Sequence, residues 1–107
     1  MTAWEVARVA ARVRALAAAG EVRFTLKALR ELAALGLDWS DACEILVGLR
    51  AAAFVERLAS RETGEWMYVF KPVVGGIVVY LKLILRAGCL VVSFHEDEGD
   101  EEANDST

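Results

Sequence analysis

The sequence predicts a single α+β domain, in which N-terminal helices pack on one face of an antiparallel β-sheet. Up to about Leu49, apolar residues recur at spacings of three and four, which is the period of an α-helix. After Leu49 the chain becomes rich in Val, Ile, Tyr and Phe, and its side chains alternate as in strands. The length of 107 residues is that of one domain. Helices followed by strands are typical of an α+β layer.

Three helices are expected, and each has a capping residue where it should begin. Thr2 precedes the first helix, and Glu5 three residues later completes a capping box. Thr25 precedes the second helix and Asp38 the third, and both side chains can accept from exposed backbone N–H groups. The first two helices should end at glycines, Gly20 and Gly36.

Three strands are expected in the second half of the chain, at Glu65–Lys71, Ile77–Leu85 and Cys89–His95. The breaks between them are short and contain turn residues. Neighbouring strands should therefore be antiparallel, because a parallel connection needs about a dozen residues or more. Residues 50–60 are ambiguous, since they either extend the third helix or contain a strand from Phe54 to Ser60.

Alternation in the last two strands separates an apolar side from a polar side. The apolar sides, which should face the helices, hold Val79, Leu81, Leu83 and Leu85 on one strand and Leu90, Val92 and Phe94 on the next. The opposite sides hold Tyr80, Lys82, Ser93 and His95. If helices cover only the apolar face, the Tyr, Lys and His face is open enough to be a functional site.

The charge of the chain divides into a basic body and an acidic tail. The net charge of −4, from 12 basic and 16 acidic residues, at first argues against a nucleic-acid ligand. Seven of the acids and none of the bases lie in residues 96–107, so residues 1–95 carry +3. We expect one domain at 1–95 and a disordered tail at 96–107. The tail is interpreted as a solubilising segment, or alternatively as one that occupies a basic groove when substrate is absent.

Composition excludes several classes of protein. A hydrophobic content of 56% excludes disorder throughout the chain. The longest uncharged stretch, Pro72–Leu81, has ten residues, whereas a membrane-spanning helix needs about 20. Cys43 and Cys89 cannot form a disulfide framework, and with one His they provide no metal-ligand cluster. We expect a cytoplasmic protein without a metal or other cofactor.

Several short segments between residues 19 and 95 form a pattern of order and spacing. They are AGEVRFTLKAL at 19–29, LGLDWSDAC at 35–43, Phe54, WMYVFKP at 66–72, VYLK at 79–82 and LVVSF at 90–94. In this register the chain resembles the MqsR-type toxins of bacterial toxin–antitoxin pairs. The resemblance implies a RelE-like fold and an mRNA interferase that cuts messenger RNA without a metal. It also implies two partners, messenger RNA and a cognate antitoxin protein.

The resemblance further implies four functional positions on this chain. Tyr80 matches the tyrosine of the family pattern. His95 stands where the family has a lysine, and both residue types can transfer protons. Glu56 and Met67 stand where the family has a lysine and a glutamine.

Metal-free RNA cleavage uses the 2′-hydroxyl of the RNA as nucleophile, so it needs proton transfer and stabilisation of phosphate charge. The candidate catalytic residues are His95 and Tyr80 for proton transfer and Lys82 for the phosphate. Arg57 and Lys71 are candidates for RNA binding. Two alternatives remain open, namely a non-catalytic protein- or RNA-binding member of the same fold, and a small α+β domain whose apolar first helix docks a partner.

Overall fold

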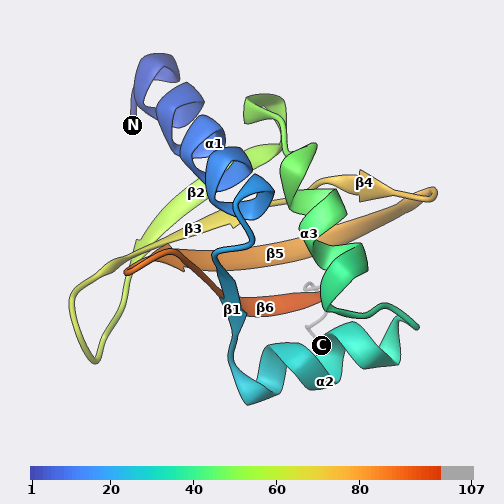
Figure 1. Ribbon diagram of the computed structural model, residues 1–107. Helices are drawn as coiled ribbons and strands as arrows, with labels where there is room; N and C mark the ends of the chain where they lie inside the picture. The colour runs from blue at the N-terminus through green and yellow to red at the C-terminus, as the bar shows by residue number, and fades with distance from the viewer. Residues whose placement is uncertain (100–107) are drawn as a thin grey trace.

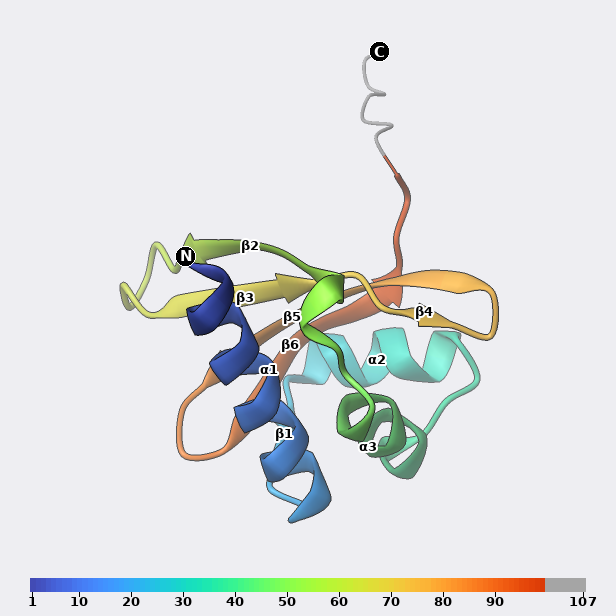
Figure 2. The same ribbon diagram turned by 90° about the horizontal axis from the view of Figure 1, so that it is seen from above.

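The computed structural model describes residues 1–99, and it has three α-helices on one side of a six-stranded sheet (Figure 1). In chain order the elements are α1 (Ala3–Ala18), β1 (Val22–Phe24), α2 (Leu26–Ala34), α3 (Trp39–Val47), the 3₁₀-helix η1 (Ala51–Ala53), β2 (Phe54–Ala59), β3 (Trp66–Phe70), β4 (Val73–Val74), β5 (Ile77–Leu85) and β6 (Cys89–Glu96). Seen from above, the helices lie on one side of the sheet, and the other side is uncovered (Figure 2). This arrangement confirms the predicted α+β class and agrees with a RelE-like fold.

The helices begin where their caps predict. In α1, Thr2 Oγ1 accepts from the Glu5 N–H at 3.1 Å, and Glu5 Oε1 accepts from the Thr2 N–H at 2.7 Å. Asp38 and Asp41 exchange the same pair of bonds at the start of α3, each 2.9 Å long. Such caps contribute about 1 kcal/mol each and so fix the first residue of a helix. No helix within residues 1–99 is both long and apolar enough to cross a membrane.

The sheet has the order β1-β6-β5-β3-β2, and β4 pairs with β5 outside this path. The three predicted strands are confirmed, and the ambiguous segment forms β2 rather than a longer helix. All pairs except one are antiparallel. The exception is β1, which pairs parallel with β6 and which the sequence did not predict. A strand of three residues is too short to show an alternating pattern in the sequence, and it is recognised only from its pairing with β6.

A β-bulge changes which side chains of β6 face the helices. Lys82 pairs with Ser93 and Leu83 pairs with Val91, so β6 has one extra residue, Val92. The prediction was therefore right for Phe94 and wrong for Leu90 and Val92. Beyond the bulge the buried positions on the helix side are Val91 and Cys89.

The core lies between the helices and the apolar side of the sheet. Its buried members include Val13 and Leu16 of α1, Leu46 of α3, and Phe70, Leu81 and Phe94 of the sheet. Cys43 and Cys89 are both free thiols within it. Burial raises the pKa of both thiols, that of Cys89 to about 12. They therefore act as small apolar side chains, as expected.

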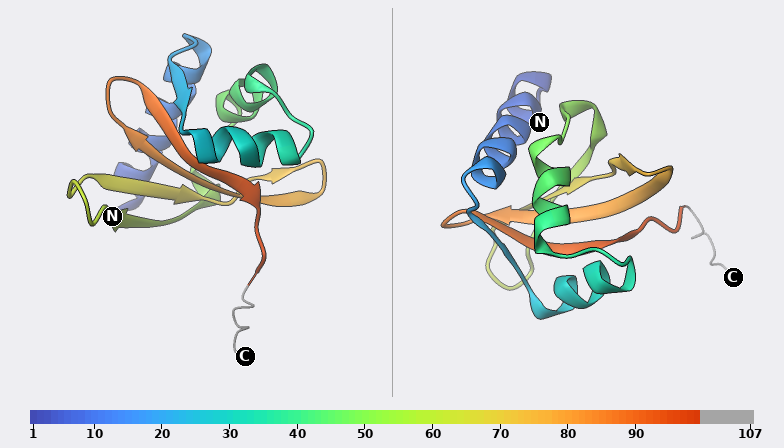
Figure 3. Two further views of the ribbon diagram at one scale, coloured as in Figure 1. Left: turned by 90° about the horizontal axis from the view of Figure 1, so that it is seen from below. Right: turned by 45° about the vertical axis from the view of Figure 1, so that its right-hand side comes forward.

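Helix α2 covers the edge of β6 that β1 leaves unpaired (Figure 3). The Phe94 N–H donates to Glu31 Oε1 at 2.9 Å, so a carboxylate takes the place of a neighbouring strand. Lys27 Nζ donates to Ser93 Oγ at 3.0 Å and forms an ion pair with Glu31 at 2.9 Å. This side of the sheet is therefore closed to further strands.

Candidate functional site

The face of the sheet opposite the helices, here called the open face, gathers polar side chains from the three strands β2, β5 and β6. Cross-strand pairing sets Tyr80 beside His95, and it sets Lys82 between Val69 and Ser93. Glu56 of β2 lies on the other side of Val69. Because side chains alternate, Met67 shares this face with Val69. The four positions implied by the family pattern, Glu56, Met67, Tyr80 and His95, therefore lie on one surface.

A small apolar floor supports these polar groups. Val69 is 0% exposed and Ile84 is 7% exposed, yet neither belongs to the core cluster beneath the helices. Both are held in the centre of the open face, under the side chains around them. Val69 is the cross-strand partner of both Glu56 and Lys82, so the stems of these side chains can lie on apolar surface while their charged ends reach solvent.

Tyr80 and His95 form the centre of the site. Their rings are stacked, with centroids 5.1 Å apart and planes 9° from parallel, and both are half-buried. Nδ1 of His95 lies 2.9 Å from the carbonyl oxygen of Glu96. A carbonyl only accepts, so Nδ1 is the nitrogen that carries the proton in this contact. Nε2 is then the nitrogen through which the imidazole can exchange a proton with a ligand.

The environment of Tyr80 favours its neutral form. Burial raises the pKa of its phenol, and the negative charges of Glu56 and Asp97 raise it further, while Lys71 acts in the opposite direction. The hydroxyl therefore stays protonated at neutral pH. Tyr80 is suited to donate a hydrogen bond or a proton, and not to accept one as a base.

Lys71 meets the beginning of the acidic segment on this face. Its Nζ lies 3.2 Å from Asp97 Oδ1, and the two side chains are 32% and 16% exposed. The N–H of Asp97 donates to the carbonyl of Val78 at 2.8 Å, which fixes the residue beside β5. Glu96 is still part of β6, and residues 97–99 leave on the side away from the helices (Figure 2). The rest of the expected tail, residues 100–107, lies outside the described residues.

Lys82 is half-buried and takes part in none of the ion pairs formed within residues 1–99. It shares its face with Tyr80, two residues away on β5. Its ammonium group is therefore available to an anionic ligand held over Tyr80 and His95.

Arg57 lies on the other side of the sheet. It pairs with Tyr68, which packs against the core, whereas its neighbour Glu56 pairs with Val69 on the open face. Its guanidinium lies over the ring of Trp66, 3.7 Å from the centroid. The structure thus brings Lys71 together with Tyr80, His95 and Lys82, and it separates Arg57 from them. The Trp66 ring is 45% exposed, so of the alternating aromatics on β3 only Phe70 is fully in the core, with Tyr68 at its border.

His95 also borders a hollow between α2 and the end of β6, with a volume of about 770 Å³. Four carboxylate side chains line it: Glu31, Glu96, Asp97 and Glu98. They disfavour a phosphate there, so a polyanion should reach His95 from the side of Tyr80 and Lys82. Within residues 1–99, no three His, Cys, Asp or Glu side chains are grouped so as to hold a metal ion.

Sequence reasoning missed Asp97 as a part of this site. The run of acids in which it stands has no apolar residue larger than Ala and therefore predicts a tail. Its contact with Lys71 joins residues far apart in the chain, and no local pattern predicts such a contact.

Comparison with known proteins matches the part of the chain that carries this site. A family model described as "Motility quorum-sensing regulator, toxin of MqsA" matches residues 9–96. The mRNA interferase toxin MqsR of Escherichia coli (strain K12) is 34% identical over 86 residues, which cover 79% of this chain and 88% of that protein.

Proposed function

The chain belongs to the MqsR toxin family, and from this premise we propose that it is a metal-independent endoribonuclease that cleaves messenger RNA. In this proposal it is the toxin of a type II toxin–antitoxin pair. The observation that carries the proposal is the stacked pair of Tyr80 and His95 on the open face, with Lys71 and Lys82 beside it. These groups are of the kinds that RNA cleavage by an internal 2′-hydroxyl requires.

His95 and Tyr80 divide the two proton transfers between them. Nε2 of His95 accepts the proton of the 2′-hydroxyl, and the oxygen attacks the adjacent phosphorus. As the bond from phosphorus to the 5′-oxygen breaks, the Tyr80 hydroxyl gives its proton to that oxygen. The products are a 2′,3′-cyclic phosphate and a 5′-hydroxyl, and exchange with water returns the two side chains to their first state. Each transfer contributes about 10²- to 10⁴-fold to the rate.

Lys82 and Lys71 act on the charge that develops on the phosphorane. A positioned ammonium group stabilises this charge most in a partly desolvated site. Lys82 forms none of the ion pairs within residues 1–99 and can contact the phosphate directly. Lys71 is paired with Asp97 and must exchange this carboxylate for the phosphate. Glu56 acts indirectly, because its charge raises the pKa of Tyr80 and so keeps the phenol as a proton donor.

The partners and the location follow from the same premise. We propose a cognate antitoxin protein, supported by the description of the family as the toxin of MqsA. We propose the cytoplasm as the location, where the free thiols Cys43 and Cys89 would stay reduced. Residues 1–95 would form the catalytic domain and residues 96–107 an acidic tail.

The test is RNA cleavage in the presence of a chelator. The purified chain should convert RNA into fragments that end in 2′,3′-cyclic phosphate. Tyr80→Phe removes one hydroxyl but keeps the ring against His95, so it should cleave about 10²-fold more slowly while remaining folded. Expression of the parent chain should arrest growth, and co-expression of the neighbouring gene should restore it. Intact RNA after incubation with the parent chain contradicts the proposal.

A further inference from the structure

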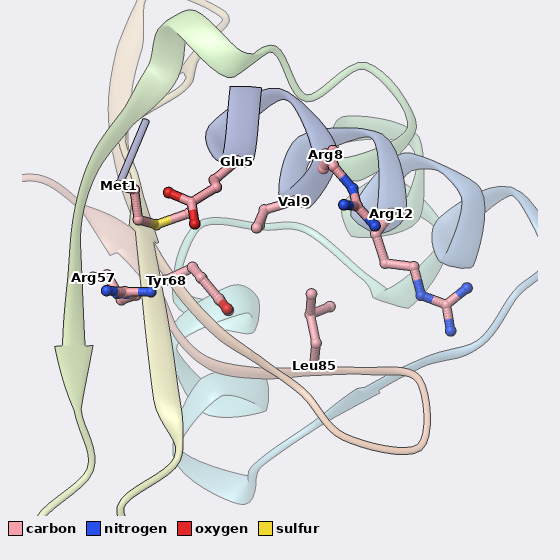
Figure 4. Close-up of a pocket in the computed structure, with 8 residues that line it drawn as sticks. All are labelled: Met1, Glu5, Arg8, Val9, Arg12, Arg57, Tyr68 and Leu85. Atoms are coloured by element: carbon pink, nitrogen blue, oxygen red, sulfur yellow. The ribbon is translucent and has the colours of Figure 1, made fainter. Parts of the chain in front are cut away.

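A basic site lies on the helix side of the sheet, in a groove between α1 and the strands β2, β3 and β5 (Figure 4). Its volume is about 340 Å³. The residues that line it are Met1, Glu5, Arg8, Val9, Arg12, Arg57, Tyr68 and Leu85. Arg8 and Arg12 come from exposed positions of α1 and Arg57 from β2, and the name arginine groove is used for it below.

The arginine groove carries an excess of positive charge. Guanidinium groups are charged at every physiological pH, and Arg8, Arg12 and Arg57 form none of the ion pairs found within residues 1–99. Glu5 is the one carboxylate among the lining residues, and its Oε1 already accepts from the Thr2 N–H at 2.7 Å. That hydrogen bond lowers the pKa of Glu5 and holds its charge at the end of the helix. Three cations against one anion favour a ligand that is itself anionic.

Exposed aromatic rings accompany these arginines. The guanidinium of Arg57 lies 3.7 Å from the centroid of Trp66, and that of Arg8 lies 6.0 Å from the centroid of Trp4. As whole residues, Trp66 and Trp4 are 45% and 70% exposed. The hydroxyl of Tyr68 points into the groove (Figure 4). Flat rings and guanidinium planes are the surfaces on which unpaired bases stack, whereas an acidic peptide would use only the cations.

The position of the groove connects it with the open face. β2 is the last strand on its side of the sheet, and its successive residues Glu56 and Arg57 face opposite ways. β2 is three interstrand spacings from β6, each about 4.8 Å. A strand of RNA bound over Tyr80 and His95 can therefore run across the sheet and around the edge of β2 into the groove.

We propose that the arginine groove binds single-stranded RNA outside the cut site, with phosphates on Arg8 and Arg12 and a base on the plane of Arg57. This inference rests on the proposed ribonuclease function in taking RNA as the ligand. The catalytic face then holds the nucleotides that react, and the arginine groove holds the flanking part of the same strand.

The test measures the binding of a single-stranded RNA whose 2′-hydroxyls are replaced by fluorine, so that it cannot be cleaved. In fluorescence anisotropy at low salt, Arg8→Ala/Arg12→Ala should weaken binding about 10-fold or more. The slope of log affinity against log salt should become shallower by about 0.7 for each phosphate that the variant no longer neutralises. The matched control, Arg30→Ala/Arg50→Ala, removes the same charge from exposed positions outside the groove and should leave both quantities close to those of the parent.

Cleavage assays separate this inference from the proposed function. The parent chain should cleave a longer RNA more efficiently than a short RNA that spans only the cut site. Arg8→Ala/Arg12→Ala should cleave the short RNA at the parent rate, but it should not cleave the longer RNA more efficiently than the short one. If the parent chain cleaves nothing, the proposed function fails, while the anisotropy still reports on the groove. Equal affinities and salt slopes for the two double variants would overturn the inference. The inference would also be overturned if Arg8→Ala/Arg12→Ala lost affinity for an acidic peptide while its affinity for RNA stayed unchanged, because the groove would then be a site for a protein.

Discussion

The open face and the arginine groove, the two regions proposed to bind RNA, differ in how their charges are held. On the open face, charges of both signs lie close together over an apolar floor, and the central tyrosine and histidine are half-buried. In the arginine groove the charged side chains are three guanidinium groups on exposed positions and the capping carboxylate of Glu5, whose pKa is lowered by its hydrogen bond with Thr2. The first arrangement tunes protonation, and the second attracts phosphate over a wide range of pH.

The surroundings of a polar side chain decide whether it suits proton transfer or the anchoring of a ligand. In the proposed mechanism Tyr80 serves in proton transfer because Glu56 and burial set which form its phenol keeps. A side chain serves in anchoring when its charge is permanent and its end reaches solvent, as for Arg8 and Arg12.

The largest effect is expected for His95→Ala. Cleavage should fall about 10²- to 10⁴-fold, because the variant has no base to accept the 2′-hydroxyl proton. The affinity for uncleavable RNA should stay within a few-fold of the parent, since the arginine groove is untouched. Single-turnover cleavage and anisotropy on one preparation measure both. A variant that loses RNA binding to the same extent as cleavage would show that the two regions do not divide the work.

A smaller effect is expected for Lys82→Ala. Removal of a charge-assisted hydrogen bond to the phosphate should lower cleavage roughly 10-fold. The change should appear in kcat more than in KM, because this interaction strengthens as charge develops in the transition state. Lys82→Arg keeps the charge and should recover most of the rate. If Lys82→Ala raised KM and left kcat unchanged, Lys82 would serve to anchor the RNA, as proposed for Arg8 and Arg12.

A still smaller effect, of opposite sign, is expected for Asp97→Asn. The substitution releases Lys71 from a carboxylate 3.2 Å away. Affinity for uncleavable RNA should rise up to about 5-fold at low salt, which is the range of a partly exposed ion pair. The gain should disappear at high salt, where screening weakens both interactions of Lys71. Glu44→Gln removes an exposed carboxylate from α3 and serves as a control for net charge.

The smallest effect concerns the titration of Tyr80. In a Tyr68→Phe background, absorbance of the remaining phenolate should show a pKa above the ordinary value of about 10. Glu56→Gln should lower that pKa, because it removes one of the negative charges that oppose ionisation. The phenol would then lose its proton at a lower pH, so cleavage should begin to fall at a lower pH in the variant. An unchanged titration midpoint would remove Glu56 from the site.

Much of the fold follows from local signals in the sequence. Thr2, Thr25 and Asp38 fix the starts of the helices, because a cap is a contact within three residues of chain. The strands β3, β5 and β6 follow from composition and from the turns between them. The face that holds Tyr80 and His95 follows from simple alternation on each strand.

The rest depends on contacts that no local pattern contains. The bulge at Val92 changes which face of the sheet Leu90 and its neighbours point to. The bulge itself depends on the register of β6 with β5. A register shift between Phe54 and Glu56 helps to decide that Glu56 lies on the open face and Arg57 on the other. Arg57 therefore had to be grouped with Lys71 from the sequence alone, although the structure sets it beside Arg8 and Arg12.

The burial of both cysteines makes the protein convenient for site-specific labelling. Cys43 and Cys89 lie in the core, and their raised pKa values leave little thiolate to react with a maleimide at neutral pH. A Ser40→Cys variant would place a thiol at an exposed position of α3, and this thiol should react far faster than the other two. A fluorophore can thus be attached at one chosen point, with no need to replace the native cysteines first.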